Sequence, residues 1–138
     1  MVEVMGSIKA SMRFVPQEVK IYRPNKNRIS TTLLNCIDRS TIGAQKFFIR
    51  VADFDDAEVG FYMLYCQSSN IYVLHALAVK EHLRGRGLGS WLLGHAIGLT
   101  ESKGGRQLLS YSLESKDFLR SKGFASDENF LRYTFLPE

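Results

Sequence analysis

The spacing of hydrophobic residues changes along the chain, and the changes separate expected strands from expected helices. Residues 7–23 predict an early strand region, whose firmest part reads EVKIYRP. The dipeptide Pro24-Asn25 then breaks the chain. The segment from Ile29 to Arg39 has weak helical character. The first third of the chain therefore predicts one strand region and one uncertain helix.

Three strands are predicted in close succession in the middle of the chain. The segment from Gln45 to Asp53 is dense in aromatic and β-branched residues, and the segment from Val59 to Gln67 returns after the turn DFDDAE. This pair is typical of a β-hairpin. The segment from Ile71 to Val79 is nearly all apolar, which is typical of a central strand in a sheet covered on both faces.

The second half of the chain alternates between helix and strand patterns. A helix is predicted from about Leu88 to Ser102, because apolar residues recur there at steps of three and four. Gly94 and Gly98 lie one turn apart in it, and each costs roughly 1 kcal/mol of helix propensity. We therefore expect this helix to pack closely against the sheet.

A further strand is predicted from Arg106 to Leu113, followed by a short helix that starts at Glu114 and is capped by Gly123. The stretch NFLRYTFL closes the chain as a strand. Strands followed by strand, helix, strand, helix and strand predict an α/β domain with a mixed sheet.

Composition fits a single globular domain that spans residues 1–138. Hydrophobic residues make up 45% of the 138 residues, which is an ordinary globular share. No apolar run reaches the length of a membrane span, and the N-terminus has no secretory pattern. Cys36 and Cys66 lack metal-ligand spacing. We expect a cytoplasmic protein with reduced thiols and no metal.

The positive charge is unevenly distributed. The net charge is +4, and the segment from Lys80 to Arg106 carries five basic residues against Glu81 and Glu101. A solvated surface and an anionic partner both account for this pattern. Nucleic acid is a poor candidate partner, because the sequence has no helix-turn-helix, zinc-finger or aromatic RNA-binding pattern. A small polyphosphate ligand fits better, because the basic residues flank a glycine-rich turn.

That turn places glycine at positions 85, 87 and 89, where the helix is about to begin. Glycine permits positive φ angles and close approach of the backbone to a ligand, and the first turn of a helix presents free N–H groups to an anion. The P-loop pattern is absent from the sequence, and the dinucleotide pattern G-x-G-x-x-G fails at Ser90. The remaining pattern is Arg84-x-x-Gly87-x-Gly89.

In this strand-to-helix context the pattern resembles the hallmark [Q/R]-x-x-G-x-[G/A] of the GNAT superfamily of acetyl-CoA-dependent N-acyltransferases. The segments LHALAVKEHLRGRGLGSWLL, FIRVADFDDAEVGFYML and FLRSKGF are similar to the corresponding parts of that family. The resemblance covers about residues 45–124. It implies a mixed, mostly antiparallel central sheet flanked by helices, and transfer of an acetyl group from acetyl-CoA to a primary amine.

The resemblance also implies how acetyl-CoA is held. Backbone groups of Leu77, Ala78 and Val79 would pair with the pantetheine arm, which Ser112 would also contact. Backbone amides in the glycine turn would bind the pyrophosphate: Arg84, Gly85, Arg86, Gly87, Leu88, Gly89 and Ser90. Arg84 and Arg86 can each add charge-assisted hydrogen bonds worth roughly 1.5–3 kcal/mol.

The catalytic groups are less certain, because the resemblance fails at two functional positions. The expected central strand has no carboxylate to act as the base, so His75 is the first candidate, although a structural histidine would look the same in the sequence. Glu114 is the second candidate base. At the position where the family commonly has a tyrosine as the general acid, this sequence has Leu119. Tyr111 is a candidate substitute.

Two functions from different classes therefore stand at this point: an N-acetyltransferase, and an acetyl-CoA-binding regulatory module with little or no transfer activity. Thiol release from acetyl-CoA in the presence of amines distinguishes them. The sequence does not name the acceptor, and it leaves open whether exposed edge strands pair two copies into a homodimer.

Overall fold

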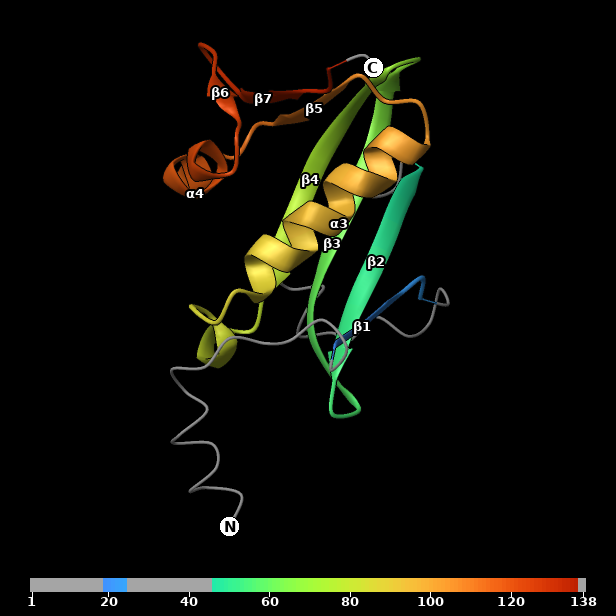
Figure 1. Ribbon diagram of the computed structural model, residues 1–138, viewed down its shortest axis with the longest axis vertical. Helices are drawn as coiled ribbons and strands as arrows, with labels where there is room; N and C mark the ends of the chain where they lie inside the picture. The colour runs from blue at the N-terminus through green and yellow to red at the C-terminus, as the bar shows by residue number, and fades with distance from the viewer. Residues whose placement is uncertain (1–18, 25–45, 137–138) are drawn as a thin grey trace.

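A computed structural model of the protein describes residues 19–24 and 46–136. Seven strands form one sheet in the order β1-β2-β3-β4-β5-β7-β6, and helix α3 crosses one face of it (Figure 1). The elements are β1 (Val19–Tyr22), β2 (Phe47–Phe54), β3 (Ala57–Ser68), β4 (Ile71–Val79), η3 (Glu81–Leu83), α3 (Leu88–Ser102), β5 (Gln107–Ser110), η4 (Leu113–Ser115), α4 (Lys116–Ser121), β6 (Ala125–Ser126) and β7 (Leu131–Thr134). The rest of the predicted early strand region and the predicted helix from Ile29 to Arg39 lie outside the described residues.

The sheet is mixed and mostly antiparallel, as predicted. Strands β4 and β5 pair in parallel, whereas every other neighbouring pair in the described sheet is antiparallel. The parallel pair follows from the connection through α3, because a parallel neighbour requires a crossover longer than a tight turn.

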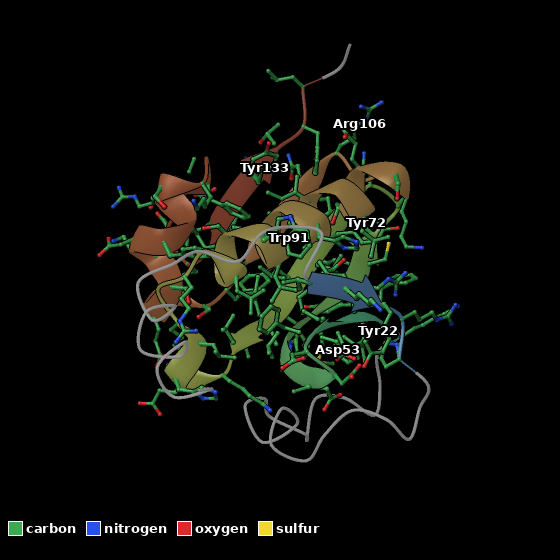
Figure 2. The ribbon with its side chains drawn as sticks, turned by 60° about the horizontal axis from the view of Figure 1, so that its bottom comes forward. Tyr22, Asp53, Tyr72, Trp91, Arg106 and Tyr133 are labelled. Atoms are coloured by element: carbon green, nitrogen blue, oxygen red, sulfur yellow. The ribbon has the colours of Figure 1, made fainter. Side chains whose placement is uncertain are left out.

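The predicted hairpin is formed by β2 and β3, and its two-residue turn consists of Asp55 and Asp56. Both residues have positive φ angles, 54° and 61°, which suits the twist of a tight β-hairpin. Beside this hairpin, the Tyr22 hydroxyl on β1 donates a hydrogen bond to Oδ1 of Asp53 at 3.2 Å (Figure 2). Only Asp55 and Asp56 of the predicted DFDDAE turn therefore form it, because the residues on either side belong to β2 and β3.

Helix α3 packs against β3 and β4 through its apolar stripe, in which Leu92 and Ala96 are fully buried. The closest approach is at Gly60 on β3, where a Cβ atom would lie 2.7 Å from the Ala78 carbonyl oxygen and 2.9 Å from Cδ1 of Leu92. A side chain at Gly60 would push the helix and the neighbouring backbone away.

The expectation that glycines within the helix allow this packing was wrong. A Cβ atom at Gly94 or Gly98 would meet nothing within 4 Å, and both residues lie on the exposed side of α3. The residue that permits the close approach is on the strand, at Gly60.

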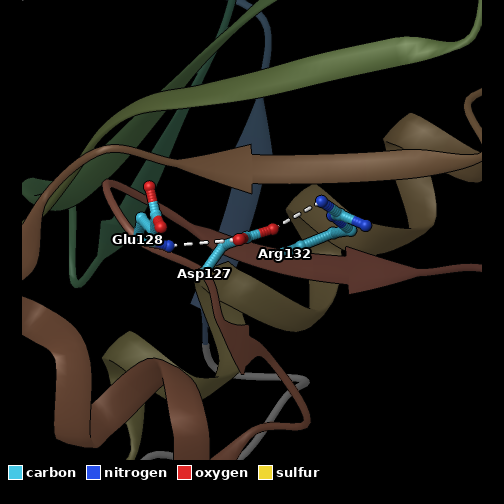
Figure 3. A network of polar contacts seen from close by, with 3 residues as sticks. All are labelled: Asp127, Glu128 and Arg132. Atoms are coloured by element: carbon cyan, nitrogen blue, oxygen red, sulfur yellow. Dashed lines mark hydrogen bonds and ion pairs between the residues drawn. The ribbon is translucent and has the colours of Figure 1, made fainter.

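The C-terminal strand predicted from Arg106 to Leu113 ends at Ser110, and the chain then turns through η4 into α4. The short strand β6 was not predicted. It pairs with β7, and the connection between them holds an ion pair of 2.6 Å between Nη2 of Arg132 and Oδ2 of Asp127 (Figure 3). Oδ1 of Asp127 accepts a hydrogen bond from the Glu128 amide.

Strands β4 and β5 separate soon after they meet. Their pairing covers only Ile71–Val73 against Gln107–Leu109, although β4 continues to Val79. Figure 1 shows the two strands diverging beside α3. Among the described strands, the backbone edge of β4 that faces β5 therefore has no partner beyond Val73. Within the described ranges, no helix is both long and apolar enough to cross a membrane.

Candidate functional site

The divergence of β4 and β5 opens a cavity of about 900 Å³, a size that suits a large organic ligand. The cavity extends along the free edge of β4, and its walls include the glycine turn before α3, the end of β5 and the start of α4. It is lined by Leu74, His75, Ala76, Leu77, Ala78, Val79, Arg84, Gly85, Gly87, Gly89, Ser90, Ser110, Ser112, Glu114, Ser115, Phe118 and Leu119.

The glycine turn presents backbone to the cavity. Gly85 and Gly87 have φ angles of 81° and 88°, a region that other residues rarely adopt. Gly87 is the N-cap of α3, and no side chain caps this helix start. The first N–H groups of the helix therefore remain available to an anion, and the partial positive charge of the helix end favours one there.

Gly89 is not required by the packing of the protein itself. A Cβ atom there would lie 3.8 Å from Cζ of Phe118 and 4.0 Å from Cγ2 of Val79, which are ordinary van der Waals contacts. Gly89 has no positive φ angle, yet it lines the cavity. The absence of a side chain at this position therefore leaves room for a ligand rather than for a neighbouring residue.

Arg84 braces the turn against the strand. Its Nε donates a hydrogen bond of 3.0 Å to the carbonyl oxygen of Val79, the last residue of β4. The residue is exposed and lines the cavity. The guanidinium group thus fixes the turn relative to β4 and places a positive charge at this end of the cavity.

Three of the predicted residues do not line the cavity. Nη2 of Arg86 donates a hydrogen bond to the His82 carbonyl oxygen at 3.4 Å. The side chain of Leu88 is buried in the core, which leaves only its backbone for ligand binding. The Tyr111 hydroxyl donates to Oε1 of Gln67 at 3.0 Å. The predicted roles of Leu88 and Tyr111 stay predictions.

His75 stands at an irregularity in β4. Met63 pairs with Ala76, and the next residue of β3, Leu64, pairs with Leu74, so His75 is the extra residue of a β-bulge. Bulges redirect side chains out of the regular alternation. The half-buried imidazole lines the cavity, and its ring centroid lies 5.0 Å from that of Phe47.

On the opposite wall, the end of β5 contributes serine hydroxyls. Ser110 is buried, and its Oγ accepts a hydrogen bond from the Ser112 amide at 3.3 Å. Both serines line the cavity, as does the exposed Glu114 in η4. The two predicted residues Ser112 and Glu114 therefore line the same cavity as His75.

Six lining residues were not among the predicted site residues: Leu74, Ala76, Ser110, Ser115, Phe118 and Leu119. Leu74 and Ala76 belong to the same free strand edge as the predicted Leu77 to Val79, so the apolar pattern of β4 could have identified them. Ser110 lines the cavity because β5 diverges from β4, and no local sequence pattern signals that divergence.

Leu119 in α4 lies between the main core and the cavity. It is 2% exposed and packs in the main core, and it also lines the cavity. No proton donor is present at that position.

The imidazole on α3 lies outside the cavity and has a structural role. Nδ1 of His95 shares a hydrogen bond of 2.6 Å with the Tyr62 hydroxyl on β3. Burial raises the pKa of Tyr62 well above its usual range, and burial followed by the nearby charge of Arg50 lowers the pKa of His95. Both shifts favour the neutral pair, which joins α3 to the sheet.

No metal site accompanies these groups within the part of the chain that the structure describes, because no three His, Cys, Asp or Glu side chains there are placed to hold an ion. The described part of the site is therefore built from backbone amides, hydroxyls, one imidazole, the Arg84 guanidinium, the Glu114 carboxylate and apolar walls.

Comparison with known proteins identifies the arrangement. The family described as "Acetyltransferase (GNAT) domain" matches residues 44–126. No curated protein sequence matches the chain.

Solved structures share its fold. A GNAT family acetyltransferase from Elizabethkingia anophelis, with acetyl-CoA bound, superposes with a TM-score of 0.76 at 18% identity, over 86% of this chain and 99% of that one. An IAA acetyltransferase from Bacillus cereus gives 0.72 at 23% identity, over 85% and 99%. An acetyltransferase from Bacillus subtilis in complex with CoA gives 0.71 at 18% identity, over 86% and 99%.

Proposed function

This chain belongs to the GNAT acetyltransferase family, and we propose that it binds acetyl-CoA in the cavity between β4 and β5 and transfers the acetyl group to a primary amine. The observation that carries the proposal is the continuity of the cavity, which joins the glycine turn at one end to His75 at the other. The similar structures that hold acetyl-CoA and CoA support the choice of cosubstrate.

The residues present fit this cosubstrate. The turn from Arg84 to Ser90 offers uncapped helix amides and positive-φ glycines to a pyrophosphate group. The free edge of β4 from Leu77 to Val79 offers backbone hydrogen-bonding groups to the amides of a pantetheine arm, much as an added strand would. Ser112 faces the same space.

Bound acetyl-CoA supplies the acetyl group as a thioester, whose carbon–sulfur bond is exchanged for a carbon–nitrogen bond. An alkyl ammonium group such as that of lysine has an ordinary pKa of about 10.4, so it first releases one proton to solvent. The neutral amine then loses its second proton as the carbon–nitrogen bond forms. His75 is proposed to accept that proton, because its ring lines the cavity where the strand edge becomes free. An amide N–H of Leu77 to Val79 is proposed to stabilise the developing negative charge on the thioester oxygen.

Leu119 is apolar, so the side chain at this position of α4 cannot donate a proton to the departing thiolate. The proton taken by His75 can return to the CoA sulfur, which balances the reaction as acetyl amide and free thiol. Glu114 is the alternative base, and Tyr111 is the alternative acid.

The regulatory module is the second candidate function, and Leu119 is the observation that favours it. A buried leucine at the acid position is compatible with a protein that binds acetyl-CoA and transfers the acetyl group poorly or not at all.

The test measures two quantities on the full chain. Calorimetry gives the affinity for acetyl-CoA, and thiol release from acetyl-CoA with a panel of primary amines gives the transfer rate. We expect both binding and amine-dependent thiol release. Binding without release from any amine would favour the regulatory module, and absence of binding would reject the site.

A further inference from the structure

Aromatic rings gather beside the reaction end of the cavity. We call these five residues the aromatic patch: Phe47, Tyr65, His75, Tyr111 and Phe130. The ring centroids of Phe47 and Tyr65 lie 5.7 Å apart with the planes at 89°. His75 lies 5.0 Å from Phe47 and 6.2 Å from Tyr65, and Tyr111 lies 5.8 Å from Phe130.

Within the patch, Phe47 belongs to the face of the sheet opposite α3. Phe47 packs with Val51, Phe61 and Met63, which form a cluster separate from the main core under α3. The next residue, Phe48, points to the other face and packs against the main core. In β2 the patch therefore continues a separate apolar layer, because successive side chains alternate between faces.

The patch and the cavity share one residue. His75 lines the cavity and also contacts two aromatic rings of the patch. The β-bulge at His75 turns this imidazole out of the regular alternation of β4. A molecule that rests on the patch can therefore present a group to His75 while acetyl-CoA occupies the cavity on the other side of that ring.

The outer members of the patch are accessible. Tyr111 is 48% exposed, and Phe47, Tyr65 and Phe130 are half-buried. The Tyr111 hydroxyl is held by Gln67, itself the extra residue of a second bulge, in β3. This hydrogen bond fixes the ring of Tyr111 without covering its face.

Charge near the patch excludes other acceptor classes. Among the described residues, the cavity lining includes one carboxylate, Glu114, so a polyamine would find little there to bind its additional positive charges. The guanidinium of Arg132 lies 5.4 Å from the Phe130 ring, but it is paired with Asp127. An acceptor with its own carboxylate would have to compete with Asp127 for that partner.

The phenol of Tyr65 is an uncharged part of the aromatic patch. Burial, and next the neighbouring Tyr111, raise the pKa of Tyr65 above its usual value, so its ring stays uncharged at physiological pH. Such a surface favours a flat apolar group, because aromatic faces and edges attract one another beyond the effect of area alone.

We propose that the acceptor is a small arylalkylamine, whose ring rests against Phe47, Tyr65 and Tyr111 and whose primary amine reaches His75. This inference rests on the proposed acetyl transfer. The amine nitrogen forms a bond to the acetyl carbon, the bond to the CoA sulfur breaks, and the amine proton leaves through His75.

The first experiment compares amines on the full chain with saturating acetyl-CoA. Phenethylamine carries the ring, 2-cyclohexylethylamine keeps the carbon count without the aromatic face, and spermidine adds charge. We expect kcat/KM for phenethylamine to exceed that for 2-cyclohexylethylamine about three- to tenfold, in line with the strength of aromatic contacts. We expect spermidine to be the poorest of the three. Equal or reversed values would overturn the inference.

The second experiment uses neighbouring residues on opposite faces of one strand. Phe47→Leu should raise KM for phenethylamine about tenfold, with little change in kcat or in the affinity for acetyl-CoA. Phe48→Leu is the matched control, because it makes the same change one residue away on the face under α3. A similar KM in both variants would remove the aromatic patch from acceptor binding.

The two proposals fail in different ways. If 2-cyclohexylethylamine is acetylated as well as phenethylamine, the acetyl transfer stands and the arylalkylamine inference falls. If no amine in the panel releases thiol while acetyl-CoA still binds, the transfer itself is rejected, and the inference with it.

Discussion

The two ends of the cavity would recognise the ligands proposed for them by different means. The phosphate end is made of backbone, with Gly85 and Gly87 in the left-handed region and an uncapped start of α3. The reaction end is made of side chains, above all His75, Ser110 and Leu119. Backbone amides are present whatever the sequence, so the phosphate end depends on conformation. The reaction end depends on residue identity, so it can change its chemistry without disturbing cofactor binding.

The largest effect is expected at the phosphate end, from Gly87→Val. A β-branched residue would be strained at a φ angle of 88° and would block the approach of a phosphate to the backbone. We expect acetyl-CoA binding to be lost in calorimetry. Gly98→Val is the matched control, because a Cβ atom at this position of the same helix would meet no described atom within 4 Å. Undiminished affinity in Gly87→Val would move the phosphate site elsewhere.

The next largest effect is expected at the reaction end, from His75→Gln. A positioned base contributes about 10²–10⁴ in rate, so we expect kcat to fall by at least about 100-fold while the affinity for acetyl-CoA is kept. In the unaltered protein the rate should rise with pH, as general-base catalysis requires, and the variant should lack this rise.

His95→Gln is the control for that measurement, because it removes an imidazole that hydrogen bonds to Tyr62 outside the cavity. Its pH–rate profile should keep the rise. An unaltered profile in His75→Gln would instead make His75 a structural residue, and Glu114 would then be the base to test.

A smaller gain is expected from Leu119→Tyr, which places a phenol beside the cavity. Even an imperfectly positioned acid should raise turnover several-fold without changing the affinity for acetyl-CoA. Leu119 is buried, so Leu119→Phe is needed to separate the hydroxyl from the added ring volume. Slower turnover in both variants would show that the ring does not fit, and Tyr111→Phe would then test the remaining acid candidate.

The smallest effect is expected far from both ends, on the exposed side of α3. Gly98→Ala should raise the free energy of unfolding by about 1 kcal/mol, since alanine favours a helix and nothing lies within 4 Å of the added carbon. Denaturant unfolding measures this gain. Gly60→Ala should have the opposite effect, because its Cβ would overlap the Ala78 carbonyl oxygen. A loss of stability in Gly98→Ala would mean that this surface of α3 is in contact after all.

The sequence indicated the conformation of the glycine turn better than it indicated which residues surround His75, for a physical reason. Glycines at positions 85 and 87 are visible in the sequence because only glycine adopts their conformation readily, and the bounds of β4 and α3 follow from strong apolar patterns. The position of Ser110 opposite His75 depends on where two strands separate. Separation is a property of the whole sheet, so no run of residues encodes it locally.

The same limit explains why the strand predicted from Arg106 to Leu113 is longer than the observed β5. The apolar stretch after Arg106 continues past Ser110 to Leu113, yet Leu113 is exposed. Its pattern is that of a buried strand, but the chain has left the sheet by that point. Close packing was likewise predicted for Gly94 and Gly98 in the helix, whereas it depends on Gly60 in a strand that lies far away in the sequence.

The short pairing between β4 and β5 forms a seam in the sheet, where few backbone hydrogen bonds join the strands on the two sides. The strand ladder that joins β5, β7 and β6 to β4 covers only Ile71–Val73 and Gln107–Leu109, although apolar side chains of β5 and β7 share the main core under α3. We therefore expect this C-terminal unit to open more readily than the β2–β3–β4 layer. A ligand in the cavity would contact both sides of the seam and stabilise the closed form by mass action. Native-state hydrogen exchange should therefore slow more in β5 and β7 than in β2 and β3 when acetyl-CoA is added.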